Sequence, residues 1–261
     1  MRVGRLIVAA SLFAAAPLGA QTVAEHVSAG VAARGARDPA GALTHFQAAL
    51  AQDSMNYQAN WEAALTLIDL GKATPDEVKS PARDSLYALA EVYARRAVTA
   101  NPSDAEGHFA LANAIGRASL TKSKKERVQR AAEIRSEALR AIQLNPRHDG
   151  AYHVLGRWNA EIMRLSGATR FFAKNFLGGD VFNQASWEGA VSNMEKAVEL
   201  NPRRIYHRLD LAEVYVDRGR ISDARTQLQR VEALPVSDPL DPTYKQQAAE
   251  LLRKIANRKD S

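Results

Sequence analysis

One short pattern recurs along the chain: a helix ends at an Asn-Pro turn and another helix starts about three residues later. The turns lie at residues 101–102, 145–146 and 201–202. Proline cannot continue a helix and disfavours the helical conformation in the residue before it, so each turn marks a helix end. A recurring helical hairpin cannot bury its own apolar face and must pack on copies of itself. The sequence therefore predicts an all-α solenoid.

The turns divide the chain into helix pairs. In the fourth unit Tyr152, Leu155 and Gly156 follow the turn at helical spacing. Small residues recur at the position of Gly156 because the two helices of a unit cross closely there; they are Gly30, Ala112, Gly156 and Ala212. The expected units are about 23–56, 57–102, 105–146, 149–202 and 205–238, followed by a capping helix at 241–257.

These units resemble the tetratricopeptide repeat, a helical hairpin with the pattern W-x2-L-G-x2-Y, then A-x3-F, then P. The resemblance implies a right-handed solenoid whose concave groove binds other molecules. From Glu133 onward the sequence also resembles the regulator of microtubule dynamics family, in the segments AIQLNP, LGRW, AKNFLG and ELNP that begin at positions 141, 155, 173 and 199. Membership would imply a non-enzymatic adaptor, and some eukaryotic relatives associate with microtubules or organelle membranes.

Residues 1–20 have the three parts of a secretory signal peptide. Arg2 and Arg5 precede an apolar run from Leu6 to Pro17, and a small residue, Ala20, ends the segment. The chain is therefore expected to be exported to the periplasm or beyond the cell, as a bacterial relative of the family. An uncleaved leader that anchors the chain is the alternative.

Composition and motifs exclude several kinds of chemistry. The chain has no cysteine, so it has neither a thiolate zinc site nor a cysteine nucleophile. No HExxH, GxSxG, GxGxxG or GxxxxGK[ST] motif occurs, and His148 and His153 do not share a helix face as a metal pair would. A net charge of +6 is too small to indicate nucleic-acid binding. We expect no catalysis, no cofactor and no metal.

The first helix of each unit should present two side chains to the groove. One lies one position after the large residue that follows the turn, and the other lies four positions further on. Asn113 and Arg157 could then hold a peptide backbone or a carboxylate. The alternative is that these are exposed polar groups or intrahelical ion pairs. The predicted groove residues are Phe109, Asn113, Arg117, His153, Arg157, Glu161, Leu209 and Glu213.

Residues 166–186 interrupt the fourth unit with an aromatic-rich insertion that contains Phe171, Phe172, Phe176 and Phe182. Three interpretations remain open: a plug that folds over the groove and narrows it, plain local core, or a segment that touches a membrane interface. The basic run from Lys122 to Arg130 is expected to be a solvated helix face, because acidic residues at helical spacing can pair with it.

The sequence thus predicts an exported protein-binding scaffold that holds a peptide or a partner helix in its concave groove, gated by the insertion. The alternative is a carrier of a small apolar ligand or lipid in a cavity that the insertion closes. Contact with a membrane is expected only if the leader remains attached, and nucleic acid is not an expected partner.

Overall fold

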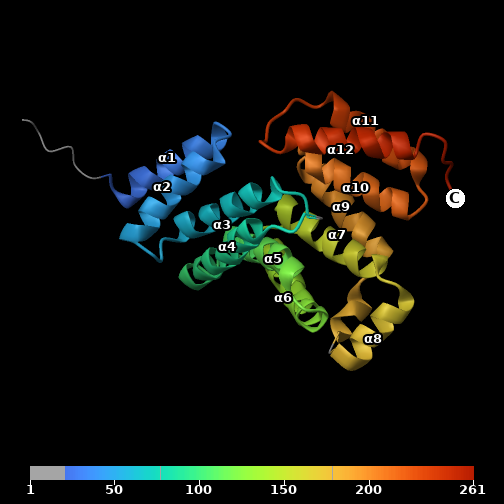
Figure 1. The fold of residues 1–261 in the computed structure, drawn as a ribbon, viewed down its shortest axis with the longest axis horizontal. Helices are drawn as coiled ribbons and strands as arrows, with labels where there is room; N and C mark the ends of the chain where they lie inside the picture. The colour runs from blue at the N-terminus through green and yellow to red at the C-terminus, as the bar shows by residue number, and fades with distance from the viewer. Residues whose placement is uncertain (1–20, 77, 178) are drawn as a thin grey trace, which may run out of the picture.

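The computed structural model describes residues 21–76, 78–177 and 179–261, with the backbone alone at 176 and 177, and this part of the chain is helical without a strand (Figure 1). The expected leader at 1–20 lies outside the described residues. The helices are α1 (Val23–Gly35), α2 (Pro39–Gln52), α3 (Tyr57–Lys72), α4 (Pro81–Ala100), α5 (Ala105–Ala118), η1 (Ser119–Thr121), α6 (Lys124–Leu144), α7 (Asp149–Arg164), α8 (Gly167–Leu177), η2 (Asp180–Gln184), α9 (Trp187–Leu200), α10 (Ile205–Asp217), α11 (Ile221–Ala233) and α12 (Asp241–Lys254).

The helices form five antiparallel pairs that stack in chain order: α1 with α2, α3 with α4, α5 with α6, α7 with α9, and α10 with α11. The first helices of successive pairs also contact one another, α1 with α3, α3 with α5, α5 with α7 and α7 with α10. Because the first helices form a continuous layer, they line the inner side of the stack. The predicted all-α solenoid is confirmed.

The Asn-Pro turns end helices as the sequence predicts. Asn101, Asn145 and Asn201 leave the helical region with φ of −146°, −136° and −136°, and each backbone N–H still donates to the carbonyl four residues earlier. The next helix starts on a side-chain cap in two of the three cases: Asp104 accepts from the Glu106 N–H and His148 from the Ala151 N–H. The turn therefore fixes both helix ends within a few residues.

Small residues on the first helix of a pair lie against a large side chain of the second helix. A Cβ atom at Gly30 would lie 2.5 Å from Phe46 Cε1, and one at Gly156 would lie 2.7 Å from Met194 Cγ. Ala112 and Ala212 are fully buried at the equivalent positions. Close helix crossing therefore accounts for the recurring small residues.

Successive hydrophobic clusters connect neighbouring units into one core. Ile68 of α3 packs in one cluster with Leu111 and Ile115 of α5. At the C-terminal end α12 packs on α10 and α11, where Ala248 and Ile255 are almost fully buried. The last unit therefore has a helix that covers its apolar surface.

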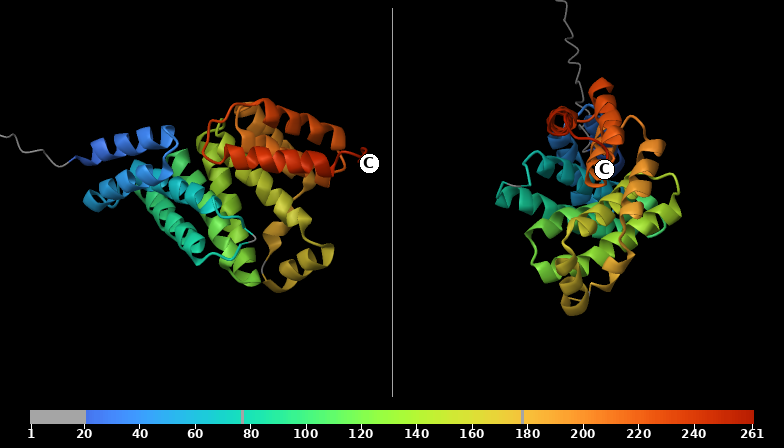
Figure 2. Two further views of the ribbon diagram at one scale, coloured as in Figure 1. Left: turned by 45° about the horizontal axis from the view of Figure 1, so that its top comes forward. Right: turned by 90° about the vertical axis from the view of Figure 1, so that its right-hand side faces the viewer.

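The insertion lies on the side of the molecule away from the last helices. Helix α8 contacts α6 and η2, and in both views of Figure 2 it lies at the opposite end from α11 and α12. Phe182 is buried near Trp158, in a cluster that also holds Ala173 of α8 and Val128 of α6. Part of the insertion therefore completes the local core.

Candidate functional site

Charged and aromatic side chains from α3, α5, α7, α10 and α12 gather on the inner side of the stack. They form what we call the inner-face cluster. Its members alternate in charge and include two tyrosines, and several are only half-buried. The inner-face cluster comprises Asp69, Lys72, Arg117, Arg157, Tyr206, Asp210, Glu213 and Tyr244.

Side chains that are distant in the sequence meet in this cluster. The Lys72 ammonium lies 5.6 Å from the centroid of the Tyr206 ring, so the end of α3 reaches the start of α10. The Arg204 guanidinium lies 5.5 Å from the same ring, and the rings of Tyr206 and Tyr244 are 6.1 Å apart. Two cations and two aromatic rings therefore occupy one part of the inner side.

Lys72 is the most unusual member of the cluster. No carboxylate of the described residues lies within 4.0 Å of its ammonium group. Burial, reinforced by the charges of Arg117 and Arg157, lowers the pKa of Lys72 to about 8. An unpaired cation that is costly to charge gains more than an ordinary lysine from an incoming anion.

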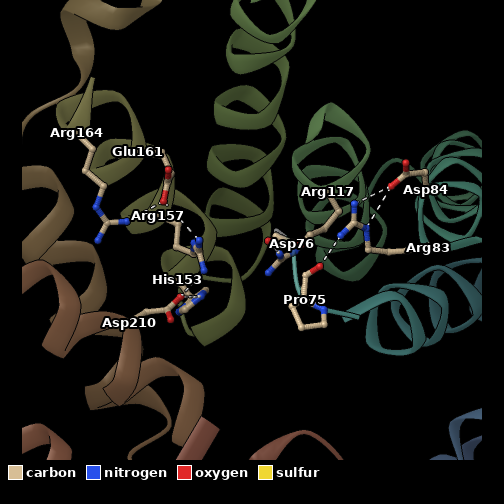
Figure 3. A network of polar contacts seen from close by, with 10 residues as sticks. All are labelled: Pro75, Asp76, Arg83, Asp84, Arg117, His153, Arg157, Glu161, Arg164 and Asp210. Carbon is tan, nitrogen blue, oxygen red and sulfur yellow. Dashed lines mark hydrogen bonds and ion pairs between the residues drawn. The ribbon is translucent and has the colours of Figure 1, made fainter. Parts of the chain in front are cut away.

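Arg117 is held by the loop between α3 and α4. Its guanidinium pairs with Asp76 at 3.1 Å, as Figure 3 shows. Arg83 positions this loop, since its Nη1 donates to the Pro75 carbonyl at 2.7 Å. Asp76 is 42% exposed, so the Arg117 pair contributes little to stability and can open toward a ligand.

A buried hydrogen-bonded chain links α7 to α10. His207 Nε2 lies 2.9 Å from Asp149, the two Nδ1 atoms of His207 and His153 are 3.0 Å apart, and His153 Nε2 lies 3.1 Å from Asp210. Arg157 pairs with Asp210 at 3.0 Å (Figure 3). Burial lowers the pKa of His153, and that of His207 to about 3.

An acidic member of the cluster, Glu213, also has a shifted pKa. Burial and the neighbouring Asp210 raise the pKa of Glu213 to about 7, although the nearby arginines oppose the shift. Arg164 lies 3.7 Å from Glu213 and 2.7 Å from Asp217. Glu213 and Lys72 therefore both titrate near neutral pH on the same side of the stack, a feature that concentrates at binding and active sites.

Most of the predicted groove residues lie near the cluster. Arg117, Arg157 and Glu213 belong to it, and Asn113 is half-buried one helical turn before Arg117. His153 is buried behind the cluster in the histidine chain. Glu161 pairs with Arg164 at 2.8 Å and with Arg157 at 3.5 Å.

Two predicted groove residues lie elsewhere. The prediction is wrong for Leu209, which is 2% exposed and packs in the C-terminal core, because this position of α10 points toward the neighbouring helices. Phe109 is half-buried and its ring packs on His148 at 4.6 Å, between two units. Neither side chain is free to serve as a principal partner contact.

Among the described residues, no hydrogen bond or ion pair joins the insertion to the inner-face cluster. Phe171 and Phe172 of α8 are 66% and 53% exposed, Phe182 is core, and the side chain of Phe176 lies outside the described part of the chain. The buried side chains of the insertion pack in one cluster with Val128 of α6 and Trp158 of α7, and this cluster holds no member of the inner-face cluster. This placement does not favour the predicted plug.

Sequence reasoning missed Asp69, Lys72, Tyr206, Asp210 and Tyr244. One signal could have found Asp69: it occupies the position in α3 that Arg117 occupies in α5. The approach of α3 to α10 depends on the curvature of the whole stack, so spacing alone does not indicate that Lys72 meets Tyr206.

The charges and rings of the inner-face cluster suit the binding of a peptide. Among the described residues no group of three or more His, Asp or Glu side chains could hold a metal ion. None of the described helices is long and apolar enough to cross a membrane. Cations, carboxylates and tyrosines at close quarters can hold the charged groups and backbone amides of a peptide.

The environment of Lys72 leads to a test by chemical labelling. At pH 8 about half of an amine with a pKa of about 8 is neutral, roughly 100-fold more than for an ordinary lysine. We expect a limiting amount of an amine-acylating reagent to modify Lys72 before the exposed Lys174, as read by peptide mass spectrometry. Arg117→Ala should slow the reaction, because one cause of the lowered pKa is removed; equal rates at Lys72 and Lys174 would contradict the assignment.

The geometry defines a tetratricopeptide-type solenoid, and solved structures agree with this class. TTC0263, a thermophilic TPR protein of Thermus thermophilus, is 20% identical with a TM-score of 0.64, over 89% of this chain and 100% of that one. PilF of Pseudomonas aeruginosa is 13% identical with a TM-score of 0.52, over 89% of this chain and 91% of that one. These likenesses concern the fold.

Comparison of the sequence with family models identifies the family of this chain. The model of the family "Regulator of microtubule dynamics protein 1-3" matches residues 31–256, so the chain belongs to this family. The match begins well before Glu133, where the resemblance was expected to start. No curated protein matches the sequence significantly.

Proposed function

We propose that this protein is a binding scaffold that holds a protein or peptide partner on its inner face. The observation that carries the proposal is the meeting of side chains from five helices around Lys72, a cation with no carboxylate of the described residues in salt-bridge range. Helical-repeat stacks use such inner surfaces for extended partners. A peptide carboxylate or acidic side chain would fit beside Lys72, Arg117 and Tyr206.

Selection of linear peptides from a random phage-displayed library on the purified chain tests this function. We expect peptides rich in acidic residues, with affinity reduced at least about tenfold by Lys72→Ala or Arg117→Ala, since each change removes a charge-assisted contact of about 1.5 kcal/mol or more. Arg140→Ala on α6 is the matched control and should leave affinity unchanged. Peptides that bind all three variants as well as the original chain would contradict the proposal.

The sequence also predicts that residues 166–186 gate the concave groove. The contacts of α8 with α6 give it no support, and we propose inner-face binding without a gate. The carrier alternative needs the same insertion to close an apolar cavity, and the inner-face cluster is strongly charged instead. Lipid recovered with the purified protein, and lost on Lys72→Ala, would favour the carrier.

We further propose that the protein acts outside the cytoplasm, as residues 1–20 indicate by their composition. Fusion of the first residues to a reporter that is active only after export tests this location. Retention of the reporter in the cytoplasm would overturn it without affecting the binding proposal.

A further inference from the structure

A second surface of the molecule gathers exposed apolar side chains. Among the described residues nine large hydrophobic side chains are exposed, and four of them lie where α5 and α7 end and α8 begins. These are Leu120, Leu165, Phe171 and Phe172, with Phe171 the most exposed at 66%. Exposed aromatic side chains that cluster in this way mark interaction surfaces.

Basic side chains lie on the same segments as these apolar residues and on the adjacent start of α6. The first turns of α6 lie beside α8, because Val128 packs in one cluster with Ala173 and also lies against the turn at Gly179. We call the apolar residues and the basic residues around them the α8 edge. Its basic members are Lys122, Lys124, Lys125, Arg127, Arg170 and Lys174.

The charges of these basic residues are not neutralised within the described part of the chain. None of them has a carboxylate within the 4.0 Å range of the ion pairs that occur elsewhere. Arg127 donates to the carbonyls of Leu120 and Lys122, and Arg170 to that of Leu165. These carbonyl oxygens orient the guanidinium groups but do not neutralise their positive charge.

Two acidic residues lie in this region: Asp180 at the start of η2, which is exposed, and Glu126, which has a local partner. Glu126 accepts from the backbone and the hydroxyl of Ser123 in a capping box at the start of α6. The sequence prediction that acidic residues at helical spacing pair with the basic run is wrong, since Glu126 bonds to Ser123 and Glu133 pairs with Arg95 of α4. Arg130 pairs instead with Glu91 of α4. The α8 edge is therefore cationic and apolar together.

We propose that the α8 edge docks on the surface of a bilayer that contains anionic phospholipids. Phosphate headgroups would pair with the basic side chains, while Phe171 and its apolar neighbours enter the boundary between headgroups and acyl chains. An acidic protein or a nucleic acid would match the charges, whereas the bilayer boundary takes up charged and apolar side chains side by side. None of the residues of the α8 edge belongs to the inner-face cluster, so docking does not use the side chains of the proposed partner site.

Vesicle sedimentation tests the proposal. The purified full chain should bind vesicles of phosphatidylcholine mixed with phosphatidylglycerol more tightly than vesicles of phosphatidylcholine alone, and added salt should weaken binding. Each basic residue contributes roughly fivefold in affinity, so the double variant Lys124→Glu, Lys125→Glu should lose roughly 25-fold or more. Phe171→Ser should also weaken binding.

Matched variants exclude contributions from elsewhere in the chain. Arg253→Glu with Lys254→Glu on α12, and Val92→Ser on α4, change similar exposed side chains and should have no effect. All variants keep the same residues 1–20, so any contribution of that segment is common to them. Binding that is equal in all variants would overturn the proposal.

A spectroscopic measurement distinguishes membrane entry from simple charge attraction. Phe171→Trp should add fluorescence that brominated phospholipids quench, whereas Val92→Trp should not. Loss of binding in the lysine variant without quenching at position 171 would indicate an acidic macromolecule as the partner and would overturn the lipid proposal.

Discussion

Replacing His207 by leucine is expected to lower the free energy of unfolding by about 3 kcal/mol at pH 7. His207 is fully buried and bonds to Asp149 at 2.9 Å and to His153 at 3.0 Å. Leucine can make neither bond, so Asp149 and His153 each lose a hydrogen-bond partner between α7 and α10. Asn201 still donates to Asp149, which limits the loss. Urea unfolding followed by circular dichroism measures it.

The same substitution should reduce the acid sensitivity of the protein. Burial lowers the pKa of His207 to about 3, against about 6.5 in the unfolded chain. Below pH 6.5 the unfolded state therefore binds a proton that the folded state does not, and stability falls as pH falls, by up to about 1.4 kcal/mol per pH unit. The lowered pKa of His153 acts in the same direction, so the dependence is reduced in the variant and not abolished.

Unfolding measured at pH 7 and at pH 5 gives the comparison. The original chain should lose about 2 kcal/mol more than His207→Leu between these values. An identical loss in the original chain and in His207→Leu would contradict the role of the buried histidine chain.

Among substitutions at the small residues where the two helices of a pair cross, Gly156→Val should lower the free energy of unfolding the most. A Cβ atom there would lie 2.7 Å from Met194 Cγ and 3.1 Å from the Met194 backbone nitrogen. The side chain of Met194 can rotate away, but the backbone of α9 must shift, which costs about 3 kcal/mol. Thermal and urea unfolding should both show the loss.

Gly116→Ala is the matched control, because nothing lies within 4 Å of its Cβ position in α5. Alanine there should stabilise the protein by about 0.5–1 kcal/mol through helix propensity alone. Equal effects of the two substitutions would show that close crossing of α7 and α9 is not what requires glycine.

The fold could be predicted because its determinants are local. The proline after Asn145 ends α6 whatever lies nearby, and the small residue at Gly156 is needed by one neighbouring helix. A pattern of such signals, repeated along the chain, specifies how the pairs stack.

The candidate site could be predicted only in part, because its assembly depends on the curvature of the whole helical stack. The helical spacing that finds Arg117 and Arg157 also selects Leu209, yet α12 and its neighbours enclose that position. Lys72 joins the cluster because α3 approaches α10 across the stack. Likewise, the aromatic composition of residues 166–186 does not reveal that α8 packs on α6.

The most direct measurement uses a photoreactive amino acid at single positions. Benzoyl-phenylalanine would replace Asn113, on the inner side of α5, or Val92, an exposed residue of α4, and each protein would be irradiated with a selected acidic peptide. The account predicts a covalent product from position 113, suppressed by Lys72→Ala, and none from position 92. A product from position 92 alone would mean that the partner binds the outer helices, and the inner face would lose its proposed role.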